Sequence, residues 1–169
     1  MRALLRPASL VAAILVVVST LLWTNSAQAI TAPELRGQRA VQEITADMHG
    51  LDLKEKEFLK ADLREVNLSD TDLRGAVINT SQLQGADLRG ADLSNVVGFA
   101  SRFDGADLRG ATFTNAMLMQ SRFADARIEG AGFTGAVRDL PQRKLLCATA
   151  AGEHPVSGVS TRESLGCRP

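Results

Sequence analysis

The chain has 169 residues and a mass of 18.0 kDa, enough for one domain but too little for an enzyme with separate cofactor and substrate domains. Lysine plus arginine and aspartate plus glutamate number 19 each, so net charge draws the protein neither to nucleic acid nor to an anionic membrane. Aromatic residues make up 4% of the chain and tyrosine is absent, which argues against an aromatic-walled ligand pocket.

Residues 1–29 have the organisation of a secretory signal peptide. Two arginines precede an apolar run over residues 10–23, and Ala27 and Ala29 supply the small residues that signal cleavage requires. The run of about 14 residues is short for a bilayer-spanning helix, which needs roughly 20, although an uncleaved membrane anchor is the alternative. We therefore expect export, and a soluble mature chain that begins at Ile30.

The sequence from residue 51 to residue 135 repeats every five residues without a gap and divides into 17 pentapeptides, such as ADLRG at 86–90 and again at 106–110. The third position is leucine nine times, phenylalanine five times, isoleucine twice and glycine once, and the first position is Ala, Ser or Thr in 13 of 17. A period of five fits neither an α-helix nor a plain strand. Large and small residues at fixed offsets must therefore point inward from a repeating bent unit, and four bends close a square.

This A(D/N)LXX pattern resembles that of the pentapeptide-repeat proteins. The resemblance implies an all-β solenoid, a right-handed quadrilateral β-helix with about 20 residues per coil, in which each coil gains a core only by stacking on its neighbours. Residues 51–135 would then form about four coils. Three serines fall in one inward column, where their hydroxyls can satisfy backbone groups: Ser81, Ser101 and Ser121.

Gly98 is the one break in the columns of large inward residues. A vacant leucine-sized site would cost on the order of 2–5 kcal/mol. We expect Phe99 or a neighbouring segment of the chain to fill part of this space, and a ligand slot is the alternative.

Seven pentapeptides place opposite charges at the two outward positions that flank the large residue. Some pentapeptide-repeat proteins resemble a DNA duplex in shape and acidity and bind DNA topoisomerases, but that role demands a run of carboxylates without neutralising partners. We therefore expect neither DNA mimicry nor a nucleic-acid partner. The seven pairs are Asp52 and Lys54, Asp62 and Arg64, Asp72 and Arg74, Asp87 and Arg89, Arg102 and Asp104, Asp107 and Arg109, and Arg127 and Glu129.

One outer face of the expected solenoid is apolar instead of charged. A contiguous apolar patch of this kind is normally covered, either by a terminal segment of the same chain or by a partner. It is therefore the best candidate interaction surface in the sequence, for another protein or for a second copy of the chain. We call it the apolar stripe, and its residues are Leu59, Val77, Val97, Phe99, Met117 and Met119.

The segment that precedes the repeats, residues 30–50, is expected to form an N-terminal cap. Its residues 33–48 have the pattern of a short helix, with Pro33 in the first turn and Gly50 as the stop. His49 would then lie at the C-terminal end of that helix, where an imidazolium suits the helix dipole.

Residues 136–169 lie beyond the periodic region and are expected to form a small helical C-terminal cap. Residues 139–152 have the pattern of one helix, and a capping box at residues 160–163 starts a second. Cys147 and Cys167 are the only cysteines of an exported chain, so a disulfide between them is expected. A metal site that includes His154 lacks a typical ligand spacing and a fourth ligand, and a catalytic dithiol lacks the CxxC spacing.

The end of the chain, residues 146–167, resembles that of the thylakoid-lumenal pentapeptide-repeat proteins of cyanobacteria and chloroplasts. The resemblance implies a lumenal location, a helical C-terminal cap and a disulfide between the two cysteines, and it implies no known reaction. A bacterial-type signal peptide fits a cyanobacterial source, in which the same export route leads to the thylakoid lumen or to the periplasm.

The sequence contains no nucleophile-and-base set, no phosphate-binding loop and no metal-ligand cluster, so we expect no enzymatic activity and no cofactor. The favoured hypothesis is a binding or scaffold protein whose solenoid surface contacts another protein, such as a photosynthetic membrane complex or its assembly factor. The alternative is a redox-responsive protein, in which opening of the Cys147–Cys167 disulfide releases the C-terminal cap.

Overall fold

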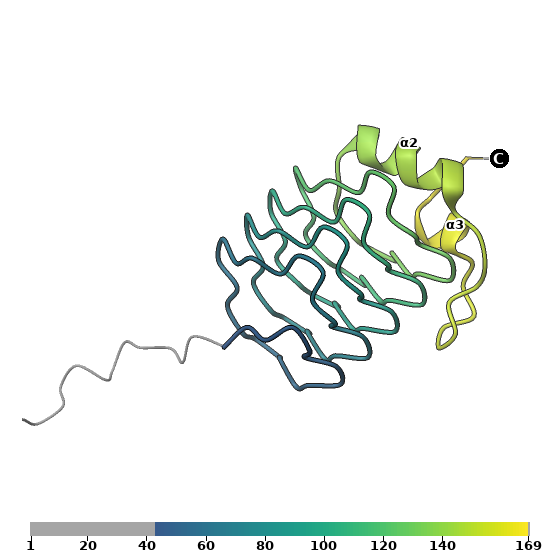
Figure 1. Ribbon diagram of the computed structural model, residues 1–169. Helices are drawn as coiled ribbons and strands as arrows, with labels where there is room; N and C mark the ends of the chain where they lie inside the picture. Colours follow the sequence, from purple (N-terminus) through teal and green to yellow (C-terminus); the bar gives the residue numbers. More distant parts are fainter. Residues whose placement is uncertain (1–42, 169) are drawn as a thin grey trace, which may run out of the picture. The chain divides into compact units, whose positions relative to one another are not determined.

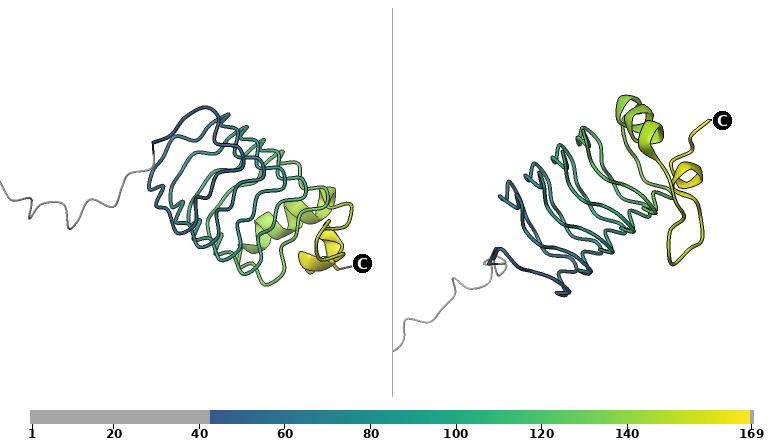
Figure 2. Two further views of the ribbon diagram at one scale, coloured as in Figure 1. Left: turned by 90° about the horizontal axis from the view of Figure 1, so that it is seen from below. Right: turned by 45° about the vertical axis from the view of Figure 1, so that its right-hand side comes forward.

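The computed structural model describes residues 43–168. Within this part of the chain, residues 46–137 wind into a stack of four-sided coils (Figure 1). Two helices follow at the C-terminal end of the stack, α2 (Leu140–Thr149) and α3 (Thr161–Ser164). The two views in Figure 2 show the coils following one another along a single axis, with α2 and α3 at the end of the last coil.

Each pentapeptide ends in a tight turn that forms one corner of the coil. In the pentapeptide 71–75, the N–H of Ala76 donates to the carbonyl of Leu73 at 3.0 Å. Gly75, the third residue of this turn, has φ +69°, in the left-handed region that type II turns require at this position. The same turn explains why glycine is the commonest residue at the fifth position of the repeat.

Successive coils are joined by parallel backbone hydrogen bonds. From Asp47 to Met117, the second residue of each pentapeptide pairs with the residue 20 positions further along the chain, as Asp52 does with Asp72. Around that pair, the N–H of Leu53 donates to the carbonyl of Asp72 at 2.8 Å, and the N–H of Asp72 donates to the carbonyl of Leu51 at 3.0 Å. The walls are therefore ladders of single bridges that run along the axis, and the expected 20-residue coil is confirmed.

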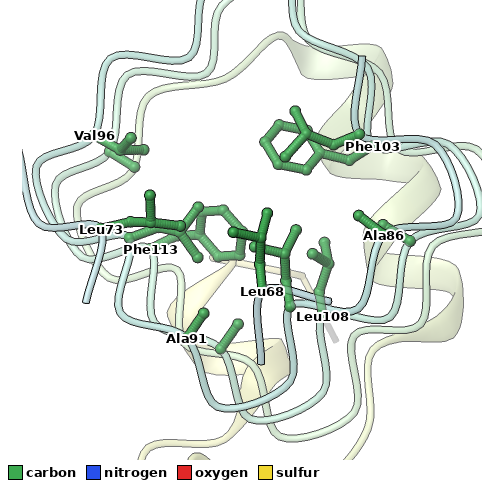
Figure 3. Packing of buried hydrophobic residues seen from close by; sticks show 14 of the residues in the cluster. Leu68, Leu73, Ala86, Ala91, Val96, Phe103, Leu108 and Phe113 are labelled. Carbon is green, nitrogen blue, oxygen red and sulfur yellow. The ribbon is translucent and has the colours of Figure 1, made fainter. Parts of the chain in front are cut away.

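The third and first positions of the repeat fill the interior, as expected. Figure 3 shows Leu68, Leu73, Leu108 and Phe113 among the side chains that point inward. The third-position side chains are at most 3% exposed, and the small first-position residues of the middle coils are buried beside them. The core is therefore one continuous column of stacked layers. Its phenylalanines stack coil upon coil, with ring centroids 4.9 Å apart for Phe103 and Phe123 and 5.0 Å apart for Phe113 and Phe133.

The serine column satisfies buried backbone groups, as predicted. The hydroxyl of Ser81 donates to the carbonyl of Phe58 and accepts the N–H of Ala61 at 3.0 Å. Ser101 and Ser121 repeat the first of these bonds one and two coils later.

The space at Gly98 is filled by its neighbours above and below, not by Phe99. A Cβ atom placed on Gly98 would lie 3.1 Å from Leu118 and 3.4 Å from Ile78, so these two side chains take up the missing volume. Phe99 points outward and is 43% exposed. The alternative of a ligand slot at this position is therefore wrong.

The N-terminal prediction needs correction, because the coil begins at Ala46 and no helix runs through Met48. Asp47 forms a parallel bridge with Asn67, and the N–H of Met48 donates to the carbonyl of Asn67 at 2.8 Å. Met48 fits the five-residue period as well as the helical one, and stacking on the next coil buries it to 1% exposure. His49 consequently lies on a coil, with its Nδ1 2.9 Å from the hydroxyl of Ser69.

Residues 30–42 of the expected N-terminal cap, and the expected signal peptide at residues 1–29, lie outside the described residues. At the other end, the coil runs past residue 135. Val137 still forms a parallel bridge with Met117, two residues beyond the predicted boundary.

Candidate functional site

The apolar stripe lies on one wall of the solenoid and runs along its axis. Val77, Val97 and Met117 stack in one ladder of parallel bridges, which places the same face of each coil in register. Leu59, Phe99, Met117 and Met119 are between 40% and 57% exposed, so no described segment covers them. The valines at 77 and 97 are half-buried between their neighbours.

Val137 extends the stripe by one coil and was not anticipated from the sequence. It pairs with Met117 in the same ladder and is 52% exposed. The signal was present, because residue 137 follows residue 117 by the coil length. The five-residue pattern predicts an end at residue 135, two residues before Val137, so the stripe expected from the sequence omits this residue.

Asn79 is the polar residue within the stripe, and Glu57 begins the ladder of bridges that continues through Val77. Asn79 lies between Leu59 and Phe99 in the column of fourth-position residues, and its Oδ1 accepts the N–H of Phe99 at 2.9 Å. This bond ties the two coils together at the centre of the stripe.

The charged pairs lie on the other walls and hold each other in place. Six of the seven predicted pairs are ion pairs, as between Arg64 and Asp62 at 2.6 Å. The hydrogen bond from Arg64 lowers the pKa of Asp62 to about 2. The seventh predicted pairing, of Arg127 with Glu129, is wrong. Arg127 instead contacts Asp107 of the preceding coil at 3.3 Å. Each pair is at least partly exposed and worth little to stability, but each places a cation beside a carboxylate of the outer walls.

The C-terminal segment covers the end of the last coil. The last turn of a parallel β-helix exposes backbone N–H groups that would pair with a further coil, and such an edge invites pairing with another chain. Here α2, α3 and their flanking residues accept these donors. The bonds run from the N–H of Gln120 to Asp139 Oδ2 at 2.7 Å, of Phe123 to Gln142 Oε1 at 3.1 Å, of Gly130 to the carbonyl of Ala151 at 2.9 Å, and of Phe133 to Ser164 Oγ at 3.0 Å.

Arg138 fastens the same segment to the coil. Its guanidinium donates to the carbonyls of Ala136 at 2.9 Å and Leu165 at 2.5 Å, and it lies 5.7 Å from the ring centre of Phe133. Burial lowers the pKa of Arg138, and the nearby positive charge of Arg143 lowers it further. The sequence pattern gave no sign of these contacts, because they lie outside the repeat.

Cys147 and Cys167 are joined by a disulfide in the structure, with their Cα atoms 5.7 Å apart. The bond links α2 to the residue that follows the turn after α3. Beside it, Leu146 and Leu165 are buried to 0% and 1% exposure against the core. The two helices are therefore held both to each other and to the last coil.

Metal-ligating side chains do not cluster in the described residues. Between residues 43 and 168, no group of three or more His, Cys, Asp or Glu side chains is placed to hold a metal ion. In the same part of the chain, no helix has the length and apolar character needed to cross a membrane.

The comparisons with known proteins agree with the coil geometry. The family model "Pentapeptide repeats" matches in eight copies over residues 46–79, 57–95, 81–115 and 99–135. The chain belongs to the pentapeptide-repeat family. Members of this family form right-handed quadrilateral β-helices, which is the architecture described above.

Several solved structures are similar to the chain. A pentapeptide-repeat protein from the thylakoid lumen of Arabidopsis thaliana is 32% identical, with 72% of this chain and 91% of that chain covered and a TM-score of 0.30. A pentapeptide-repeat protein from Nostoc is also 32% identical, with 53% and 75% covered and a TM-score of 0.48. A plasmid-mediated fluoroquinolone resistance protein is 23% identical, with 53% and 59% covered and a TM-score of 0.40. No curated protein matches the chain.

Proposed function

We propose that this pentapeptide-repeat protein is a non-enzymatic binding or scaffold protein that contacts a protein partner through the apolar stripe. The observation that carries the proposal is the exposure of Leu59, Phe99, Met117 and Met119 in register on a wall that is otherwise regular and rigid. Methionine and phenylalanine are enriched at protein interfaces, where they fill apolar pockets in a partner.

The energetics favour occupation of this wall. Fully burying one large apolar side chain contributes roughly 1.5–3 kcal/mol, so covering several half-exposed ones could supply a substantial part of a micromolar interaction. Parallel bridges join the backbone of each coil in this wall to the coils before and after it. Little conformational entropy is therefore lost when a partner binds. The charged walls, by contrast, present neutralised pairs that provide no strong attraction.

The architecture that we propose for the whole chain has about four coils, with the signal peptide removed and the C-terminal end closed by the disulfide-linked segment 136–169. An N-terminal cap from residues that precede the coil is part of the same proposal. The location that we propose is the thylakoid lumen or the periplasm. The signal-like residues 1–29 and the 32% identity to a thylakoid-lumen protein support it.

In that compartment, the partner that we propose is a photosynthetic membrane complex or one of its assembly factors. A homodimer through the stripe is the competing use of the same surface. A second candidate function is redox control, and the observation that favours it is the single disulfide that joins both helices of the cap. In that case reduction, and not the stripe alone, would govern binding.

The test is affinity capture from a lumenal extract with the mature protein and two variants. The stripe variant carries Phe99→Ser and Met117→Gln, and the control carries Val156→Ser, which replaces a side chain that is 88% exposed and lies off the stripe. We expect a defined partner to be captured by the mature protein and the control, and to be lost with the stripe variant. Circular dichroism confirms that all three are folded.

Three outcomes would point away from the proposal or to one of its alternatives. Light scattering that shows a dimer for the mature protein and a monomer for the stripe variant would assign the stripe to self-association. Equal capture by the stripe variant and the control would contradict the proposal. Capture that changes only after reduction of Cys147–Cys167 would favour redox control.

A further inference from the structure

A short hairpin between α2 and α3 lies alongside the last coils of the solenoid (Figures 1 and 2). Glu153 and Ser160 form its antiparallel bridge. The N–H of His154 donates to the carbonyl of Val159, and the N–H of Gly158 donates to the carbonyl of His154, both at 2.9 Å. From residue 151 to residue 158, the side chain of His154 is the one that is buried, at 3% exposure. A titratable side chain is thus the anchor of this hairpin.

The solenoid provides a seat for the hairpin through glycines in its last coils. A Cβ atom on Gly132 would lie 3.0 Å from the ring of His154, so the imidazole rests directly on the backbone at that point. A Cβ atom on Gly130 would lie 3.1 Å from the carbonyl oxygen of Glu153, and one on Gly110 would lie 3.7 Å from Pro155. The fit is close, so the ring cannot shift within its seat without moving the hairpin.

The hydrogen bonds define where the proton of the imidazole lies. Nδ1 of His154 accepts the backbone N–H of Ser157 at 3.1 Å. Nε2, 2.8 Å from Thr112 Oγ1, therefore carries the hydrogen and donates to that hydroxyl. A second proton on Nδ1 would point at the N–H of Ser157, which cannot reverse to accept it. The Ser157 hydroxyl, 3.2 Å from Nδ1, could turn to accept this proton, but the backbone bond would still be lost.

The charged groups around the ring of His154 do little to stabilise its protonated form. Asp92, two coils back in the same column as Gly132, favours the protonated ring, but its Oδ2 also lies 3.8 Å from Arg74 Nε. Elsewhere around the hairpin, Glu129 packs against Gly152, Arg109 is paired with Asp107, and Glu153 is the other ionisable residue of the hairpin itself.

We propose that His154 is a pH-sensitive latch, which docks the hairpin on the last coils while the imidazole is neutral and releases it when the imidazole is protonated. Burial lowers the pKa of His154 from its ordinary 6.5, and the charge of Asp92 offsets only part of that effect. Because the docked pKa lies below the undocked one, docking is strongest above about pH 6.5 and weakens as the pH falls through the docked pKa.

The release is local. The hairpin lies between Cys147 and Cys167, so the disulfide keeps its two ends close together after the ring leaves its seat. The coils, whose core does not involve His154, remain stacked. The consequence of acidification is therefore the exposure of the wall near Gly110, Gly130 and Gly132, and not unfolding of the solenoid.

Amide hydrogen exchange on the full mature protein between pH 7.5 and 4.5, corrected for intrinsic rates, tests the latch. We expect the protection of the Gly158 and Thr161 amides to fall by up to tenfold for each pH unit between about pH 6.5 and the docked pKa, and to level off below it. The amide of Phe103, which donates to Arg122 within the coils, should keep its protection. His49→Gln, which removes an exposed histidine, is the matched control and should leave the pH dependence unchanged.

His154→Gln should abolish the pH dependence in this range. If that variant undocks the hairpin at every pH, Thr112→Val supplies the second test, because it removes the acceptor of Nε2 while leaving the titration in place. It should raise the pH at which protection is lost. The latch is refuted if the ring of His154 titrates at or above pH 6.5 by NMR, if Gly158 protection is independent of pH, or if His154→Gln leaves its pH dependence intact.

Discussion

Leu88→Ala probes the column of inward residues at its centre. Leu88 is fully buried, and Leu68 and Leu108 lie in the coils on either side of it, also fully buried. The substitution removes three carbon atoms, worth about 2.4 kcal/mol at roughly 0.8 kcal/mol each. The ladders fix the spacing of the coils, so the neighbours cannot close the cavity, and the total loss should reach about 2–5 kcal/mol.

Urea unfolding followed by circular dichroism measures this loss. With a slope of about 2 kcal/mol per molar urea, the midpoint should fall by about 1–2.5 M. Arg89→Ala is the matched control, because Arg89 is the next residue along the chain and its side chain is exposed in an ion pair with Asp87. Its midpoint should move far less. Equal shifts for the two variants would refute the assignment of inward and outward positions, and with it the core described above.

Three further predictions concern the termini and the outer walls. N-terminal sequencing of the native protein should find Ile30, because Ala27 and Ala29 satisfy the small-residue requirement for cleavage, and a retained Met1 would contradict export. Reduction of Cys147–Cys167 should increase hydrogen exchange in α2 and α3 but not in the coils, and loss of protection throughout would mean that the cap holds the solenoid together. The carboxyl of Asp62 should titrate with a pKa of about 2, because the hydrogen bond from Arg64 favours its charged form. The stability that this ion pair contributes is therefore present above the ordinary pKa of 3.8 and is lost as the pH falls through 2. An NMR midpoint near 3.8 would contradict this prediction.

The features that repeat could be predicted from the sequence because one coil determines the next. Ser81, Ser101 and Ser121 occupy equivalent positions, so a single argument about buried hydroxyls applied to all three. The apolar stripe was identified in the same way, since outward residues of one wall recur at a fixed interval. The structure places the stripe residues in register along one wall and leaves Leu59, Phe99, Met117 and Met119 exposed.

Where two periods competed, the sequence alone was ambiguous. Met48 fits a helical face and also the third position of a pentapeptide, and the backbone bonds to Asn67 decide in favour of the coil. Phe99 is large enough to fill the space at Gly98. The side chains of Ile78 and Leu118, in the coils on either side of Gly98, occupy that space instead. Arg127 pairs with Asp107 of the preceding coil because the two residues are neighbours in the same ladder of bridges.

The contacts of the C-terminal segment could not be predicted, because they join residues that no period relates. Gln142 and Ser164 accept edge N–H groups of the last coil, and their sequence context shows no sign of this role. The sequence pattern raises His154 only as a candidate metal ligand, whereas its partner in the structure, Thr112, is 42 residues away. Such pairs depend on how the chain returns over the last coil, which only the three-dimensional structure shows.

Site-specific photo-crosslinking in living cells tests the central claim most directly. A photoreactive residue placed at Met119 in the apolar stripe should form a crosslink to a protein partner, and the same residue at Val156, off the stripe, should not. The account predicts a discrete adduct at position 119 that disappears when Phe99→Ser and Met117→Gln are also present. Absence of any adduct at position 119, or the same adduct from both positions, would contradict a binding role for this wall.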